Sequence, residues 1–447
     1  MIVPPEASPL LAALAPVFTQ PTYQRFLTLA CAAILTQGRR TVANLLRTVG
    51  FLAAGHRTSY QRVLSEARWS GLELGCALAA FLLRHLIPDG PVTLLGDDTV
   101  DGHRGQKVYG KARHRDPVRS TRSYTAWRYG HKWVVLAVLV RFPFAGRPWA
   151  LPILIDLYRS RQDNEARRRK HRTPAQLMCR LLRLMLIRFP ARTFAFVGDA
   201  GYGTHEVARF CCRHRGRLTL VSKLHPDANL VQPPPPYAGQ GRPRVKGAAL
   251  PKPRQAVAHL APRSRTRLTV GWYGGGTRRV ATVTGTGHWY KSGRGLVPIR
   301  WVFVEDLTGT HREEYFFTTD PGRTPAAVIT ADTGRWNPET TFRECRSCLG
   351  LESTRGWCRA TVLRAAPCLF GLYSVVAALY HLLPEAKRTG RITWPGKVGV
   401  TFSDAVGAVR QWLWAEGVFP QAIGPSAAQK LPPSFRDLVL ASLATAA

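Results

Sequence analysis

The chain has 447 residues, 45% of them hydrophobic, which is enough for a large buried core divided among two or three domains. Its nine cysteines have no even, regular spacing, which excludes a disulfide-stapled secreted scaffold and indicates a reducing cytoplasm. The net charge of +36 favours a polyanionic partner, nucleic acid first, with an anionic membrane surface or a merely arginine-rich genome as the alternatives.

The first 89 residues show a helical pattern. Apolar residues recur at helical spacing in 8–18, 22–36, 41–49, 57–66 and 70–87. The third and fourth segments are joined through a turn at Gly55, which is compatible with a helix-turn-helix. We therefore assign residues 1–89 to a helical DNA-binding domain, although a plain helical cap on the core would need the same spacing.

After Gly90 an apolar strand ends in two acids, Asp97 and Asp98. Strands are predicted at 133–140, 149–157, 193–199 and 217–223, with helices at 174–187 and 204–213. The strand at 193–199 ends in Asp199. Carboxylates at the ends of adjacent strands can converge on hard cations such as Mg²⁺, whereas the alternative is that they are ordinary turn acids. Side chains alternate along a strand, so Asp97 and Asp98 cannot both point at one ion.

A basic, proline-rich segment that cannot form a regular helix follows Lys223. Strands are then predicted at 266–273, 278–284, 298–305 and 313–318. Between them, 287–294 alternates aromatic rings with cations and is predicted to be a loop. Trp289 in this loop is a candidate for stacking on an unpaired DNA base, with a hairpin or core position as the alternative.

A helix is predicted to begin near Glu339. Asn337 suits the N-cap and Pro338 the first helical position, so Glu339 falls in the first turn. An apolar face anchors this helix, and Gly350 stops it. A charged stripe beside that face consists of Glu339, Arg343 and Arg346. Taken alone, a first-turn glutamate is ordinarily a partner of the helix dipole.

The spacing of Arg335, Glu339 and Arg346 resembles the Tyr-x2-Arg-x3-Glu-x6-Lys signature of bacterial insertion-sequence transposases. Asp332 occupies the Tyr position and Arg346 the Lys position. The segments Arg-Trp, Phe-Arg-Glu and Leu-Gly-Leu-Glu are similar to that group as well. The resemblance implies a DDE transposase whose catalytic core has an RNase H-like fold.

The fold implied by the resemblance is α/β, an RNase H-like mixed sheet with helices, preceded by the N-terminal helical bundle. The core would comprise 90–223 and 322–385, the second part carrying the Glu helix. A proline-rich and β-rich insertion, 224–321, would interrupt it, and 386–447 would form a C-terminal helical tail. The long apolar run 365–384 is expected to be an internal helix of this core and not a membrane span.

The resemblance also implies the site and its partners. The acidic triad would be Asp97, Asp199 and Glu339, holding two Mg²⁺ or Mn²⁺ ions. The family's Asp-x-Thr pattern favours Asp97 through Thr99, with Asp98 as the alternative ligand. DNA would be contacted by Arg335, Arg343, Arg346 and Trp289.

The expected enzyme cuts DNA at the inverted-repeat ends of its element and joins the freed ends to target DNA. The resemblance implies a homodimer or higher oligomer on DNA. With no signal peptide evident, we expect a cytoplasmic protein without a membrane partner, and the resemblance implies a bacterial, nucleoid-associated one. The alternatives are another RNase H-like nuclease, such as a junction resolvase, and a non-catalytic DNA-binding relative.

Overall fold

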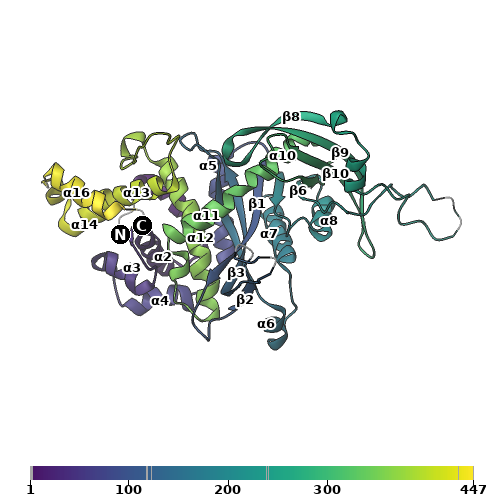
Figure 1. Ribbon diagram of the computed structural model, residues 1–447. Helices are drawn as coiled ribbons and strands as arrows, with labels where there is room; N and C mark the ends of the chain where they lie inside the picture. The colour runs from purple at the N-terminus through teal and green to yellow at the C-terminus, as the bar shows by residue number, and fades with distance from the viewer. Residues whose placement is uncertain are drawn as a thin grey trace. The chain divides into compact units, whose positions relative to one another are not determined.

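The computed structural model describes residues 4–116, 119–121, 123–237, 239, 241–430 and 432–445 (Figure 1). The chain folds into two compact units. Unit 1 comprises Met1–Pro88, Asp98–His171 and Glu339–Ala447, and unit 2 comprises Asp89–Asp97 and Arg172–Pro338. The strand β1 (Val92–Gly102) therefore belongs to both units, changing from one to the other between Asp97 and Asp98. The division into five segments made from the sequence stays a prediction.

All five predicted N-terminal helices are confirmed, with ends shifted by a few residues. Side-chain oxygens cap two of them, because the Thr41 hydroxyl accepts from the backbone of Asn44 and the Ser70 hydroxyl from that of Glu73. The helices are α1 (Ser8–Leu14), α2 (Gln20–Leu35), α3 (Val42–Val49), α4 (Arg57–Ser65) and α5 (Gly71–Leu86).

In unit 1 the strand order is β2-β3-β1, and β4 pairs with β3. The strands are β2 (Ala112–Arg115), β3 (Trp127–Val140) and β4 (Trp149–Tyr158). The predicted strands 133–140 and 149–157 are thus confirmed. They contain long runs of consecutive buried residues, as expected for strands covered on both faces. The short β2 was not predicted, because Ala-Arg-His-Arg is too polar and too short to show a period.

A long apolar helix, α12 (Arg359–Leu382), packs on β4 and α5. Among the described residues it is the one helix long and apolar enough to cross a membrane. Because 72% of its most apolar window is buried within the protein, it is a core helix, as the sequence predicted. The basic stretch after β4 contains α6 (Arg161–Ala166).

The C-terminal region is helical from Phe402 onward, whereas 388–401 of the predicted helical tail (386–447) contain no helix. It comprises α13 (Phe402–Trp412), a π-helical segment (Leu413–Val418), α14 (Phe419–Ile423), α15 (Pro425–Lys430) and α16 (Pro433–Ala444). The α13 helix packs on α12 and α16. The α13 helix continues directly into the segment with π-helical hydrogen bonds.

In unit 2 the strand order is β1-β5-β6-β11-β10-β9-β7, and β8 pairs with β9. The first three strands are parallel and the later ones antiparallel, so the sheet is mixed. The strands are β5 (Phe194–Gly198), β6 (Leu218–Lys223), β7 (Leu230–Val231), β8 (Thr266–Gly271), β9 (Thr277–Lys291), β10 (Gly295–Asp306) and β11 (Glu314–Thr318). The predicted helices are confirmed as α7 (Pro174–Arg188) and α8 (His205–Arg213), and α8 packs on β6 and β10.

Two predictions about the insertion are wrong. The segment 287–294 is not a loop but the tip of a hairpin, in which Trp289 of β9 pairs with Val297 of β10. Cross-strand pairing extends both strands beyond the apolar stretches that predicted them. The proline-rich segment contains a short helix, α9 (Pro253–Ala258), because proline is tolerated at a first helical position.

The helix that carries Glu339 starts differently from the prediction. A preceding helix, α10 (Pro325–Thr333), continues through a 3₁₀ turn (Gly334–Trp336) directly into α11 (Asn337–Ser347). Asn337 therefore has helical angles, φ −59° and ψ −36°, and is not an N-cap. Its side-chain amide donates to the Gly334 carbonyl, 2.6 Å away. The predicted stop is confirmed, since Gly350 has a left-handed φ of 62°.

Candidate active site

Parallel pairing of β1 with β5 brings two of the predicted acids to neighbouring strand ends in unit 2. The last paired residues are Gly96 and Gly198, and Asp97 and Asp199 follow them directly. Adjacent strands lie about 4.8 Å apart, so the two acids begin from neighbouring backbone positions. This is the arrangement in which two carboxylates can share hard cations.

Glycine is required immediately before each of these acids. A Cβ atom at Gly96 would lie 2.5 Å from the Phe196 ring, and one at Gly198 would lie 2.7 Å from Cβ of Tyr202. Both distances are shorter than real carbon contacts. The tight packing below the acids therefore fixes the backbone that carries them.

The Asp199 carboxylate is oriented by the loop that follows it. Its Oδ1 accepts hydrogen bonds from the backbone N–H groups of Gly201 (3.0 Å) and Tyr202 (3.3 Å). The Asp199 carbonyl accepts from the Ser222 hydroxyl on β6, at 2.8 Å. These bonds hold both the main chain and the side chain of Asp199.

Asp97 lies beside a signature arginine. Nη1 of Arg335 is 3.7 Å from Oδ2 of Asp97, and each side chain is only 12% exposed. The two residues are 238 positions apart in the chain. Their contact places a permanent positive charge next to one of the candidate metal ligands.

Asp98 has a different partner. Its Oδ1 is 2.9 Å from Nζ of Lys132 on β3, in unit 1. Asp97 and Thr99 are both buried, whereas Asp98 between them is partly exposed, which is the alternation expected along a strand. The choice of Asp97 over Asp98 as metal ligand stays a prediction.

Asp332 is an acid of this region that sequence reasoning did not select, because it appeared only as a departure from the signature tyrosine. It is fully buried on α10, and neither carboxylate oxygen has a hydrogen-bond partner among the described residues. Burial raises the pKa of Asp332 to about 6, against the opposing effect of Arg335 and Lys223. The signal available in the sequence was an acid at i+4 from Val328 on an otherwise apolar helix.

Glu339, Arg343 and Arg346 lie on α11 in unit 1. Glu339 and Arg343 are exposed. Arg346 donates to the Thr99 hydroxyl and, at 2.9 Å, to the Glu352 carboxylate. Thus the contacts of Arg346 tie α11 to the end of β1.

Trp289 is half-buried on β9. Its ring packs edge-on against His205 of α8 and Phe317 of β11, with 5.4 Å between ring centroids in each case. Nε2 of His205 is 3.1 Å from the Trp289 carbonyl. The structure therefore gives Trp289 the hairpin-packing position that was the alternative to base stacking; a role in DNA binding stays a prediction.

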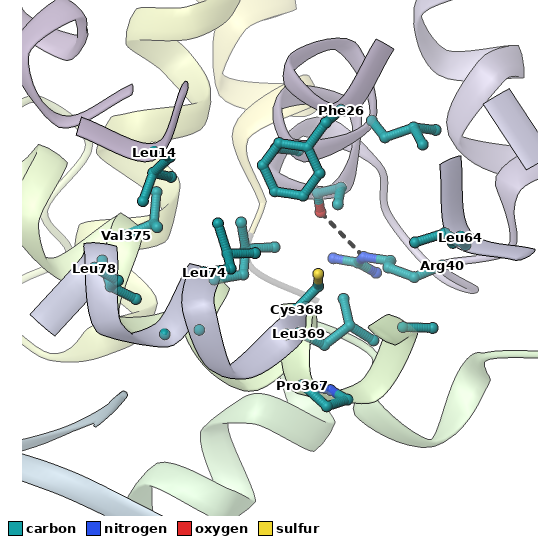
Figure 2. A pocket seen from close by; sticks show the side chains of 18 of the residues that line it. Leu14, Phe26, Arg40, Leu64, Leu74, Leu78, Pro367, Cys368, Leu369 and Val375 are labelled. Carbon is teal, nitrogen blue, oxygen red and sulfur yellow. Dashed lines mark hydrogen bonds between the residues drawn. The ribbon is translucent and has the colours of Figure 1, made fainter. Parts of the chain in front are cut away.

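A cavity in unit 1 has the wrong chemistry for cleaving a phosphodiester. It has a volume of ≈ 110 Å³ and is lined mainly by apolar side chains, among them Leu14, Phe26 and Leu74 (Figure 2). None of the described residues that line it is acidic. Its one charged group, Arg40, donates to the carbonyls of Ala33 and Cys348, so the charge is used within the fold.

Asp97 and Asp199 fit the divalent cations that the resemblance implied. They supply carboxylate oxygens, the donors preferred by Mg²⁺ and Mn²⁺, from adjacent strand ends. A hydrogen bond from the backbone holds the Asp199 carboxylate in place, and the charge of Arg335 does the same for Asp97.

The chain was compared with known protein families, curated proteins and solved structures. The family model described as DDE superfamily endonuclease matches residues 13–279, a range that includes Asp97 and Asp199 and ends before Glu339. No curated protein matches. Seven chains of solved structures match, among them the piggyBac transposase in a synaptic complex with hairpin DNA, at 10% identity and a TM-score of 0.40, over 95% of this chain and 76% of that one. Because the family model matches more than half of the chain, the chain belongs to the DDE superfamily endonucleases.

Proposed function

We propose that this endonuclease is the transposase of a bacterial insertion sequence. It cuts DNA at the ends of its element and joins the freed 3′-hydroxyls to target DNA. The observation that carries the proposal is the pairing of β1 with β5, which places Asp97 and Asp199 at neighbouring strand ends. The resemblance of 332–350 to the insertion-sequence signature supports the narrower assignment.

In this proposal Asp97 and Asp199 are metal ligands, and Glu339 is the third carboxylate. Two bound Mg²⁺ or Mn²⁺ ions would supply activation of the attacking oxygen and stabilisation of the leaving oxygen. The chain's own part is to present the carboxylates in fixed positions. Hydrogen bonds from the backbone N–H groups of Gly201 and Tyr202 do this for Asp199.

The basic residues of the signature bind the DNA backbone. Arginine forks suit phosphate oxygens, and charge-assisted hydrogen bonds are stronger than neutral ones. In this proposal Arg335, which lies beside Asp97, holds a phosphate next to the carboxylates, and the exposed Arg343 extends the basic edge of α11. Arg346 and Trp289 complete the proposed DNA contacts. The enzyme acts as a homodimer or higher oligomer on two DNA ends, in the bacterial cytoplasm.

The test is the substitution Asp199→Asn in the purified full-length protein. The amide keeps the shape of the side chain but loses the charge that holds a divalent cation, so strand cleavage in Mg²⁺ should be lost and DNA binding kept. Asp227→Asn is the matched control, because Asp227 is also in unit 2 but pairs with Arg254 at 3.5 Å. Full cleavage by Asp199→Asn would remove Asp199 from the site. Cleavage without joining, in the unmodified enzyme, would favour the resolvase-type nuclease.

A further inference from the structure

A second group of potential metal ligands lies in unit 1, where β1 ends beside β3. Asp101 is on β1, His103 follows it by two residues, and His131 is on β3. One donor atom from each residue lies within 4.8 Å of the other two. Among the described residues, this is the one group of three or more histidine, cysteine or acidic side chains whose donor atoms all lie this close together.

Asp101 is the most unusual member of this cluster. The residue is 0% exposed, and neither carboxylate oxygen has a hydrogen-bond partner among the described atoms. A buried carboxylate is costly unless a cation or hydrogen bonds compensate it, so this side chain points to a missing partner.

His131 is held in the tautomer that a metal requires. Its Nε2 is 2.9 Å from the Tyr109 carbonyl, which can only accept, so the ring proton lies on Nε2. Nδ1 therefore carries a lone pair, and it is buried without a hydrogen-bond partner in the described structure. A backbone carbonyl that fixes the far nitrogen is the usual support of a metal-binding histidine.

His103 completes the geometry. Its Nε2 is 3.4 Å from Oδ2 of Asp101. Donor atoms around a tetrahedral Zn²⁺ are roughly 3.3–3.5 Å apart, given metal–ligand bonds of about 2.0–2.2 Å. The His103 and His131 rings are 4.5 Å apart between centroids, at an angle of 62°. Small side-chain rotations would bring all three donors onto one ion.

We propose that Asp101, His103 and His131 bind one Zn²⁺ ion, at a site separate from the catalytic carboxylates. Two imidazoles and one carboxylate suit this ion, whereas Mg²⁺ prefers a set of oxygens. A cavity of ≈ 10 Å³ adjoins both histidines and Trp133, and this is about the room needed for one water as a fourth ligand. The ion ties the end of β1 to β3, four residues beyond Asp97 on the same strand.

The experiment measures metal content in the full-length protein, purified with a tag free of histidine. After incubation with Zn²⁺ and gel filtration, elemental analysis should find about one equivalent per chain, and Co²⁺ in its place should give the visible absorption of a tetrahedral site. His131→Ala and His103→Gln should weaken Zn²⁺ binding by more than about tenfold. His114→Ala is the matched control, a buried histidine on β2 that is outside the cluster and should keep the ion.

Two outcomes would overturn the proposal. These are the absence of retained Zn²⁺ in the unmodified protein, and retention of Zn²⁺ by His131→Ala equal to that by His114→Ala. A chelator should lower the melting temperature of the unmodified protein but not that of His103→Gln, a mild change at the strand end that guards against misfolding. Asp199→Asn should keep its Zn²⁺, so the result does not depend on whether the protein cleaves DNA.

Discussion

Asp97 and Asp98 are consecutive on β1 and have different ionic partners, Arg335 and Lys132. We expect Asp97→Ala to lower the rate of cleavage by more than about a hundredfold. Losing a metal ligand should lower the activity more than losing a residue that only orients a ligand. Asp98→Ala should keep at least part of the activity, since the partly exposed ion pair with Lys132 that it removes is worth about 1 kcal/mol or less.

The assay is cleavage of a labelled element end in Mg²⁺, with the folding of each variant checked by thermal melting. If Asp98→Ala is folded but inactive while Asp97→Ala still cuts, Asp98 is the ligand. Such a result would mean that β1 presents its other face to the ions, since neighbouring side chains on a strand point in opposite directions.

The buried Asp332 makes stability depend on pH. Its folded pKa is about 6 against an ordinary value of 3.8, so the folded state holds the proton more tightly than the unfolded state. The stabilisation is fully present below about pH 4 and is lost as the pH rises through about 6. Across this window the loss is about 3 kcal/mol.

Asp332→Asn, which is neutral at every pH, should therefore be more stable than the unmodified protein above pH 6, and the difference should shrink as the pH falls toward 4. Chemical denaturation in EDTA measures it without interference from divalent ions. Asp89→Asn, at an exposed position of the same unit, is the control. A difference that grows on acidification would show that the folded pKa of Asp332 is not raised.

At the scale of elements, glycines of both α5 and α12 line the apolar cavity, among them Gly75 and Gly371. A Cβ at Gly371 of α12 would have only Leu78 near it, at an ordinary 3.6 Å. Gly371→Ala should therefore stabilise unit 1 by about 0.5–1 kcal/mol, because alanine loses less backbone entropy than glycine in a helix.

Gly75 of α5 is the matched contrast. A Cβ there would lie 2.1 Å from the Ile153 carbonyl oxygen and 2.9 Å from Leu154. Gly75→Ala should destabilise the protein by about 1–3 kcal/mol, since the helix and β4 would be forced apart. Denaturant titration of both variants decides the matter, and equal effects of the two alanines would contradict this account of the packing.

At the scale of the whole molecule, the charge of +36 predicts a strong electrostatic component of DNA binding. The logarithm of the affinity for random DNA should fall with the logarithm of salt concentration by about 0.9 per phosphate neutralised. With six or more contacts, affinity should drop by roughly a thousandfold between about 50 and 200 mM salt. The affinity is measured by fluorescence anisotropy. If it did not change with salt concentration, the high charge would reflect only the composition of the genome.

Local pattern was sufficient for most helices and strands. The N-terminal helices, β5, β6 and α12 were predicted because their apolar residues repeat at the period of a helix or run continuously through a buried strand. The pattern failed where neighbours in space determine the structure. The hairpin at Trp289 needs its partner strand, and Asn337 is helical because α10 runs into α11.

The sequence by itself also determined the positions of the candidate acids, because an acid directly after an apolar strand is visible without a fold. Only the tertiary structure decided which groups surround them. Contacts between segments distant in the chain produce the parallel pairing of β1 with β5 and the ion pair of Arg335 with Asp97. Such contacts also bury Asp332 and bring His131 to Asp101 and His103. The physical reason is that burial, pKa and ligand geometry depend on contacts between distant segments, which local periodicity does not encode.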